Sequence, residues 1–135
     1  MTTAFDADVL IYAAAQGHPL GSRVARLFDR GDSGYAGVGS VLLMPEVLIK
    51  PMRLDPQSLE TLRLRRFLSR IDLHPVDQNI ITLALVLGMK YGLKTVDAIH
   101  LSTGALLGAD RFLTNNRRDF HKEIEEIDIV YPEEL

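Results

Sequence analysis

Asp6 and Asp8 interrupt an apolar run near the start of the chain, where "FDAD" leads directly into "VLIYAAA". Burying an unpaired carboxylate is costly, and a buried acid without a counter-charge normally becomes neutral. Either both acids lie at a surface turn, or at least one faces a positive charge that the chain does not supply. Two further acids, Glu46 in "LMPEVL" and Asp97 in "TVDAIHL", also lie among apolar residues. These four are the first candidates for a functional site.

Carboxylates that gather without a cation repel one another and raise each other's pKa. A hard divalent ion relieves this repulsion, and Mg²⁺ or Mn²⁺ suits oxygen ligands of this kind. Such an ion lowers the pKa of a bound water and neutralises the charge that develops on a phosphodiester. The residue types therefore indicate hydrolysis of a phosphate ester.

The pattern of apolar residues predicts short strands that alternate with helices. Strands are expected at residues 2–7, 34–39, 71–77, 110–114 and 128–132, and helices at 8–17, 19–31, 41–50, 57–70, 78–92 and 95–108. Strands separated by helices favour a parallel sheet that is covered on both faces. The predicted fold is an α/β three-layer sandwich with a central, mostly parallel sheet.

Several helix ends and one helix interior carry recognisable signals. Asp8 and Asp77 are expected to be N-caps, because each precedes an apolar helical stretch. Gly31 is expected to end the second helix. The helix at 78–92 is apolar nearly all round, which predicts that it lies at the centre of the packed core.

Composition is typical of a single soluble domain, here residues 1–135. The net charge of −3 gives the chain no overall attraction to nucleic acid, so any such binding must come from a local patch. There is no cysteine, which excludes thiolate zinc sites and fits a reducing compartment. Neither a signal peptide nor a stretch long enough to span a membrane is recognised. We therefore expect a cytoplasmic protein without membrane contact.

The predicted sheet brings distant polar residues together at the carboxyl ends of its strands. Sheets of this kind bind their ligands at that edge. Asp6 ends the first strand, and Asp97 lies in the first turn of the last helix. Asn116 and Asp119 follow the fourth strand, and Glu46 lies in the helix after the second. All five are expected at one edge of the sheet.

These motifs and their order resemble PIN-domain ribonucleases, in particular VapC-like toxins of toxin–antitoxin pairs. The resemblance is carried by "FDADVLIY", "SVLLMPEVL" and "TVDAIHLSTGALLGADRFLTNNRRDF", which extend from Phe5 to Phe120. Each motif alone is weak, whereas their joint order and the six-residue step from Ser40 to Glu46 are specific. The resemblance implies an α/β/α fold and Mg²⁺- or Mn²⁺-dependent cleavage of single-stranded or loop RNA.

The resemblance also implies which residues hold the metal. Asp6, Glu46 and Asp97 match the family's first three acids and are the expected catalytic and metal-binding residues. The fourth position, often aspartate in the family, is Asn116 here, an amide that can hold water or a ligand but adds no charge. Asp119 is a further candidate, acting through water. This departure leaves open whether one or two metal ions bind.

Residues around these ligands have expected supporting roles. Asp8 is expected to support the site as a helix cap, His100 by hydrogen bonding within the fold, and Thr114 by orienting a ligand. Arg117 and Arg118 are candidates for binding RNA phosphates. By resemblance, the protein binds a cognate antitoxin and forms a homodimer.

Two other functions are compatible with the same residues. A strand that ends in Asp-x-Asp resembles haloacid-dehalogenase-type phosphatases, in which Asp6 would be the nucleophile and Asp8 the acid/base. Against this function, no Gly-Thr follows Asp8, and the Thr-Asn element at 114–115 comes too late in the chain. The other alternative is a PIN-like module that binds RNA or protein through a weakened metal site, which the amide at Asn116 leaves open.

Overall fold

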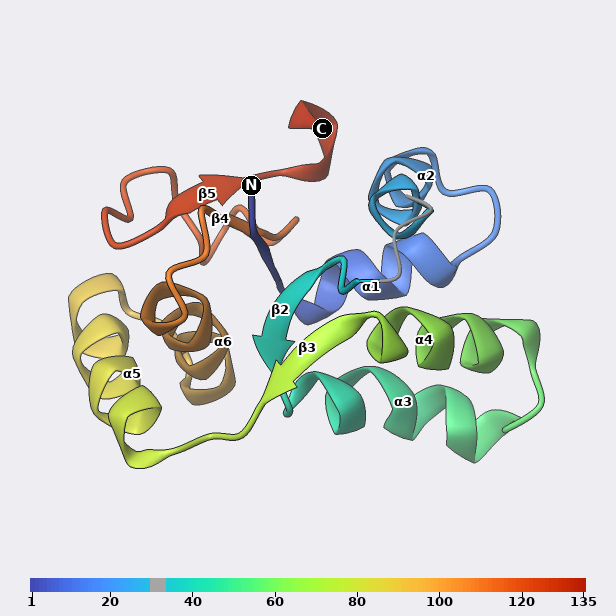
Figure 1. Ribbon diagram of the computed structural model, residues 1–135, viewed down its shortest axis with the longest axis horizontal. Helices are drawn as coiled ribbons and strands as arrows, with labels where there is room; N and C mark the ends of the chain where they lie inside the picture. The colour runs from blue at the N-terminus through green and yellow to red at the C-terminus, as the bar shows by residue number, and fades with distance from the viewer. Residues whose placement is uncertain (30–33) are drawn as a thin grey trace.

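Five parallel strands form the central sheet in the computed structural model of the protein, which describes residues 1–29 and 34–135 (Figure 1). The strands are β1 (Thr3–Phe5), β2 (Gly37–Ser40), β3 (Ile71–His74), β4 (Arg111–Leu113) and β5 (Asp128–Val130). Their order across the sheet is β3-β2-β1-β4-β5, and each neighbouring pair is parallel. The predicted α/β fold with a parallel sheet is confirmed.

The central strand β1 determines where the site forms. It pairs with β2 on one side and β4 on the other, and its three residues are all buried. Phe5 lies opposite Leu113 in the register of β1 and β4, so the residues that follow them, Asp6 and Thr114, emerge side by side. The approach of β2 to β1 is so close that a Cβ on Gly37 would lie 2.2 Å from the carbonyl oxygen of Thr3, which explains the glycine.

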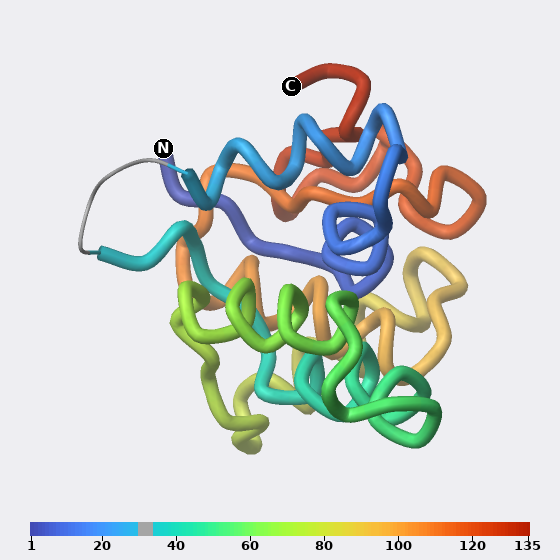
Figure 2. Tube along the Cα trace, turned by 90° about the vertical axis from the view of Figure 1, so that its right-hand side faces the viewer, coloured from blue at the N-terminus to red at the C-terminus, as the bar shows by residue number. Residues whose placement is uncertain are grey.

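Helices cover both faces of the sheet (Figure 1). They are α1 (Ala7–Ala14), α2 (Pro19–Ala25), α3 (Leu43–Leu54), α4 (Leu59–Ser69), α5 (Gln78–Tyr91) and α6 (Thr95–Leu106), with 3₁₀ turns η1 (Arg26–Phe28) and η2 (Pro132–Glu134). Helices α1, α3 and α4 pack together on one face, whereas α6 packs on the other with α5 outside it. The C-terminal segment folds back against α2 (Figure 2).

The sheet separates two hydrophobic clusters, because successive residues of a strand point to opposite faces. In β4, Phe112 belongs to one cluster and Leu113 to the other. The first cluster, under α1, α3 and α4, includes Phe5, Leu10, Leu64, Phe67 and Leu113. The second, under α6, includes Ala4, Leu101, Phe112, Phe120 and Ile129. Both sides of the sheet are therefore packed, as a parallel sheet requires.

The helix starts confirm one predicted cap and correct another. Asp77 caps α5 as predicted, since its side chain accepts a hydrogen bond from the backbone N–H of Ile80. The prediction that Asp8 caps α1 is wrong: Asp6 is the N-cap, because the chain enters the helix directly after β1. The second helix continues only as the turn η1, and its predicted end at Gly31 lies outside the described residues.

The prediction that the helix at 78–92 is central is also wrong, because α6 takes that place. All residues from Ala98 to Gly104 in α6 are buried, and a Cβ on Gly104 would lie 2.8 Å from that of Ala4 in β1. In α5, by contrast, Leu85 is 64% exposed and Met89 is 78% exposed. One apolar side of α5 packs on α6 and the other faces outward. In the described part of the chain, no helix has both the length and the apolarity to cross a bilayer.

Candidate active site

Asp6 is the most buried acid of the site, with 4% of its surface exposed. One carboxylate oxygen accepts a hydrogen bond from the N–H of Ala7 at 2.8 Å, and the other accepts from the hydroxyl of Thr114 at 2.7 Å. Burial raises the pKa of Asp6, and these two hydrogen bonds oppose the rise. The chain therefore holds this carboxylate in a fixed orientation although burial disfavours its charge.

Asp8 lies in the first turn of α1, close enough to Asp6 for the two charges to interact. Burial and then the charge of Asp6 raise the pKa of Asp8 to about 7. Both of its carboxylate oxygens face the N–H of Asn115, at 3.1 and 3.3 Å. Asp8 thus connects α1 to the segment after β4 and supports the site as expected, but not as a helix cap.

Asp97, in the first turn of α6, connects the remaining acids to this pair. Burial first, and then the charges of Asp6, Asp119 and Glu46, raise the pKa of Asp97 to about 6. The helix N-terminus alone would favour the charged form, so the rise reflects burial first and the nearby acids second. The fold therefore brings together the acids that the sequence placed at one edge of the sheet.

Glu46 is positioned by a buried histidine. The Nε2 atom of His100 lies 2.5 Å from Oε1 of Glu46, and because a carboxylate only accepts, Nε2 is assigned as the donor. The His100 side chain is fully buried, whereas that of Glu46 is 37% exposed. Within the described residues, Nδ1 of His100 has no hydrogen-bond partner. His100 thus fixes one end of Glu46 and leaves the rest of the carboxylate accessible.

Asn116 and Asp119 form a hydrogen-bonded turn after β4. The side-chain N–H of Asn116 donates to the carboxylate of Asp119 at 2.9 Å, and the backbone N–H of Asp119 donates back at 3.3 Å. The backbone N–H of Asn116 also donates to the hydroxyl of Thr114 at 3.0 Å. The charge of Asp119 acts on Asp97. The turn therefore brings the carboxylate of Asp119 to the site, beside Asn116, whose amide adds no charge of its own.

The two candidate arginines differ in their surroundings. Arg117 pairs with Glu133 and lies over the ring of Tyr131, with its guanidinium carbon 4.5 Å from the ring centre. Arg118 is exposed on the same turn. Of the two, Arg118 is the one whose charge is not already paired in a described contact.

The sequence did not reveal the contribution of the backbone. The N–H groups of Ala7 and Asn115 hold Asp6 and Asp8, yet neither residue has a side chain that marks it as functional. Their placement follows from the register that sets β1 beside β4. Only a prediction of that register could have found them.

The donor set fits a hard divalent cation. Three carboxylates with raised pKa values gather at the end of β1 and at the starts of α1 and α6, and a cation would relieve their repulsion. Among residues 1–29 and 34–135, no three acidic or histidine side chains already converge on one point. A cation held by these acids would therefore require their side chains to move closer together.

Comparison with known proteins agrees with this geometry. The family model described as PIN domain matches residues 4–126. The chain belongs to the PIN domain family. PIN domains are generally nucleases, so the acid cluster lies in a family whose members act on nucleic acids. Membership also argues against the phosphatase interpretation of Asp6 and Asp8.

Two solved structures share the PIN fold of this chain. A toxin–antitoxin complex from Klebsiella pneumoniae is 22% identical, with a TM-score of 0.72 and 98% of each chain covered. VapBC2 from Rickettsia felis, bound to a DNA fragment from its promoter, is 15% identical, with a TM-score of 0.72 and coverage of 97% of this chain and 98% of that one. No curated protein sequence matches the chain. At these identities, the structures establish the shared fold.

Proposed function

We propose that this PIN domain is an endoribonuclease that uses Mg²⁺ or Mn²⁺ to cleave single-stranded or loop RNA. The observation that carries the proposal is the gathering of Asp6, Asp8 and Asp97 at the carboxyl edge of the sheet, where burial raises the pKa of each. Structural acids on a surface have no reason to gather where burial and mutual repulsion both oppose their charge. Perturbed carboxylates of this kind are typical of functional sites.

In this proposal, Asp6, Glu46 and Asp97 hold the ion. Asn116 completes the site together with Asp119, which acts through water. When bound, a divalent ion neutralises the acids and the charge developing on the phosphate, and makes water more acidic. Whether the site takes one ion or two depends on whether Asp119 supplies the charge that the amide of Asn116 lacks.

The chain's own residues orient these acids. Thr114 and the backbone of Ala7 fix the carboxylate of Asp6, so that it does not rotate away when its charge is neutralised. His100 fixes Glu46 from the buried side, and Asp8 keeps the start of α1 against the segment after β4. Such support preorganises ligands and is a major part of how metal sites are built.

The proposed substrate contacts lie on the turn after β4. Arg118 is exposed there and is proposed to bind a phosphate of the RNA. Arg117 is proposed as a second contact, which it can make after leaving its pair with Glu133. Phosphate contacts of this type are weakened by salt.

We propose in addition that the protein is the toxin of a toxin–antitoxin pair. Support comes from the fold, which the chain shares with solved toxin–antitoxin complexes. The proposed partner is a cognate antitoxin protein, and the toxin itself is proposed to be a cytoplasmic homodimer. A neighbouring gene for a small DNA-binding protein would support this role, and an isolated gene would count against it.

Cleavage of RNA by the purified protein tests the nuclease activity. Single-stranded and hairpin RNAs are incubated with Mg²⁺, with Mn²⁺ or with EDTA, and Asp6→Asn is compared with the wild type. We expect cleavage only in the presence of a metal ion, and its loss in Asp6→Asn with the fold intact by circular dichroism. Cleavage that survives EDTA or the substitution would contradict the mechanism.

A binding module with a weakened metal site is the second candidate. It is favoured by the amide of Asn116, whose side chain is already engaged with Asp119. The same RNA experiment separates the two functions. Binding of RNA without cleavage at any metal concentration would favour the module over the nuclease.

A further inference from the structure

The segment after β5 leaves the sheet at the same edge as the acids. Strand β4 lies between β1 and β5, and the backbone N–H of Thr114 donates to the carbonyl of Val130 at 3.1 Å. Tyr131, the next residue after Val130, therefore emerges two strands away from Asp6, a separation of roughly 10 Å. A polymer that extends along this edge from Asp6 would meet the segment formed by residues 131–135.

Two arginines from separate parts of the chain converge on Glu133 in this segment. Arg117, on the turn after β4, pairs with one carboxylate oxygen of Glu133 at 2.5 Å. Arg23, in α2, donates to the backbone carbonyl of Glu133 at 2.6 Å, where the segment lies against α2 (Figure 2). Arg23 and Arg117 are referred to as the arginine pair.

The arginine pair carries more positive charge than Glu133 neutralises. The acceptor of Arg23 is a neutral carbonyl, and among the described residues Arg23 pairs with no carboxylate. Arg23 is exposed, and the side chain of Arg117 is 46% exposed. One carboxylate thus faces two guanidinium groups that solvent can reach, which suits a chain of phosphates better than a single carboxylate.

The ring of Tyr131 holds Arg117 independently of Glu133. The guanidinium carbon of Arg117 lies 4.5 Å from the centre of this ring. Tyr131 is buried, and its hydroxyl donates to the backbone carbonyl of Phe120 at 2.7 Å. Because a cation is attracted to the face of an aromatic ring, Arg117 keeps its position when Glu133 leaves. The position is then ready for another anion.

Glu133 is held more loosely than its neighbour Glu134. The carboxylate of Glu134 accepts from Lys122 at 2.5 Å and from the backbone N–H of Tyr131 at 2.9 Å. Among the described residues, the carboxylate of Glu133 has Arg117 alone as its partner. The two side chains of that pair are 46% and 52% exposed, and ion pairs so exposed contribute little to stability. Glu133 can therefore be displaced without loss of the fold.

We propose that the arginine pair is a phosphate-binding subsite for RNA, and that the carboxylate of Glu133 occupies it in place of a phosphate until RNA displaces it. This inference rests on the RNA substrate proposed above, and it extends the path of that RNA from Asp6 across the turn after β4 to α2. Guanidinium groups bind carboxylates and phosphates through the same kind of charged oxygen pair. Glu133 is thus a competitor built into the chain, and it weakens RNA binding.

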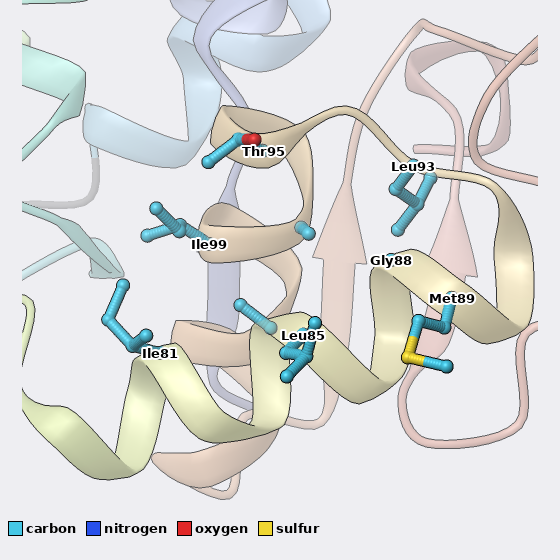
Figure 3. Close-up of a pocket in the computed structure, with 9 residues that line it drawn as sticks. Ile81, Leu85, Gly88, Met89, Leu93, Thr95 and Ile99 are labelled. Carbon is cyan, nitrogen blue, oxygen red and sulfur yellow. The ribbon is translucent and has the colours of Figure 1, made fainter.

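The groove between α5 and the start of α6 offers no comparable site for a phosphate. It is lined by uncharged residues, among them Ile81, Leu85 and Met89 (Figure 3). Since the net charge of the chain is −3, phosphate binding needs a local positive patch. The arginine pair provides such a patch at the edge of the sheet that holds the acids.

The affinity for RNA tests the competition by Glu133. Fluorescence anisotropy is measured with a labelled single-stranded RNA, in EDTA so that the RNA stays intact. Glu133→Gln should strengthen binding by roughly 2- to 5-fold, the range that corresponds to the loss of one exposed ion pair. The control Glu60→Gln removes the same charge in the first turn of α4 and should leave the affinity unchanged.

The salt dependence of binding tests the role of Arg23. Arg23→Gln should weaken binding and lower the slope of log affinity against log salt concentration by about 0.7, the value for one phosphate contact on a single strand. Arg53→Gln, in the last turn of α3, removes the same charge and should leave that slope unchanged.

A double-mutant cycle separates local competition from a general effect of charge. If Glu133 competes for Arg117, Glu133→Gln should strengthen RNA binding in the wild type and have little effect in Arg117→Gln. Equal affinities of Glu133→Gln and Glu60→Gln, or a gain that persists in Arg117→Gln, would overturn the inference.

Two further measurements distinguish the remaining outcomes. Tighter binding of an oligoglutamate peptide than of RNA of the same length would assign the arginine pair to an acidic protein and overturn the RNA subsite. Cleavage of the same RNA with Mg²⁺ separates this inference from the proposed function. Cleavage by the wild type with no gain in affinity in Glu133→Gln removes the subsite alone, whereas a wild type that neither binds nor cleaves RNA removes both.

Discussion

Replacing Thr114 with valine should destabilise the protein by removing one hydrogen bond to the central acid. The Thr114 side chain is completely buried, and its hydroxyl donates to Asp6 at 2.7 Å while accepting from the N–H of Asn116 at 3.0 Å. A hydrogen bond to a charged group contributes roughly 1.5–3 kcal/mol. The N–H of Asn116 is only partly buried and can find water, so we expect a total loss of about 2–3 kcal/mol in the free energy of unfolding.

Thr103→Val is the matched control. Thr103 is equally buried, and its hydroxyl also donates at 2.7 Å, but to the backbone carbonyl of Ile99 one helical turn earlier. That carbonyl keeps its helical hydrogen bond when the hydroxyl is removed, so the expected loss is at most about 1 kcal/mol. The two variants are therefore matched in burial, and they differ in the charge of the acceptor and in the hydrogen bond that Thr114 accepts from Asn116.

Urea unfolding at neutral pH without metal ions gives both free energies. Thr114→Val should have a lower midpoint than Thr103→Val at an unchanged slope. The difference should shrink as pH falls, because the hydrogen bond loses its charge when Asp6 takes up a proton. Equal losses in the two variants at neutral pH, or a difference that does not change with pH, would refute the view that Thr114 holds a charged Asp6.

Two further results are expected for the acids and their support. Without metal, stability should fall as pH rises from about 4 to about 7, because the folded state raises the pKa of Asp8 to about 7 and of Asp97 to about 6 and so keeps protons that the unfolded chain has released. After a discount for solvent screening at the partly exposed Asp97, the expected fall is on the order of 3 kcal/mol. Thermal unfolding across this range checks the sign, and Mg²⁺ should restore stability at the upper end but not at the lower; stability that rises with pH would contradict the cluster. His100→Ala should weaken Mn²⁺ binding by roughly 10-fold, since it frees Glu46, and His100→Gln should recover most of that loss. Calorimetric titration checks this second result, and equal affinities in both variants would exclude a positioning role.

The sequence predicted the parts of the protein that depend on local patterns. A buried strand ending in Asp6 and an acid in the first turn of the last helix were sufficient to place both at one edge of a parallel sheet. The order of strands and helices was sufficient for the fold. These features depend on short-range periodicity and on the general geometry of parallel sheets.

The errors concern contacts between distant segments. Asp8 looked like a helix cap, but the chain turns into α1 one residue earlier, and Asp8 binds the backbone of Asn115 instead. Helix α5 looked central because it is apolar on two sides, and composition cannot tell which of those sides is packed within the chain. Likewise, the turn that brings Asp119 to Asp97 is held by Asn116, a residue that the sequence indicated as a ligand for water or metal.

The central claim is that Asp6, Glu46 and Asp97 gather in order to hold a divalent cation. Calorimetric titration of the purified protein with Mn²⁺, comparing the wild type with Asp97→Asn, tests it most directly. Asp97→Asn removes one carboxylate that is only half buried, so the fold should be retained. We predict saturable Mn²⁺ binding by the wild type and a loss of at least about 10-fold in affinity for the variant. Absence of saturable binding in the wild type, or equal affinity in the two proteins, would contradict the claim.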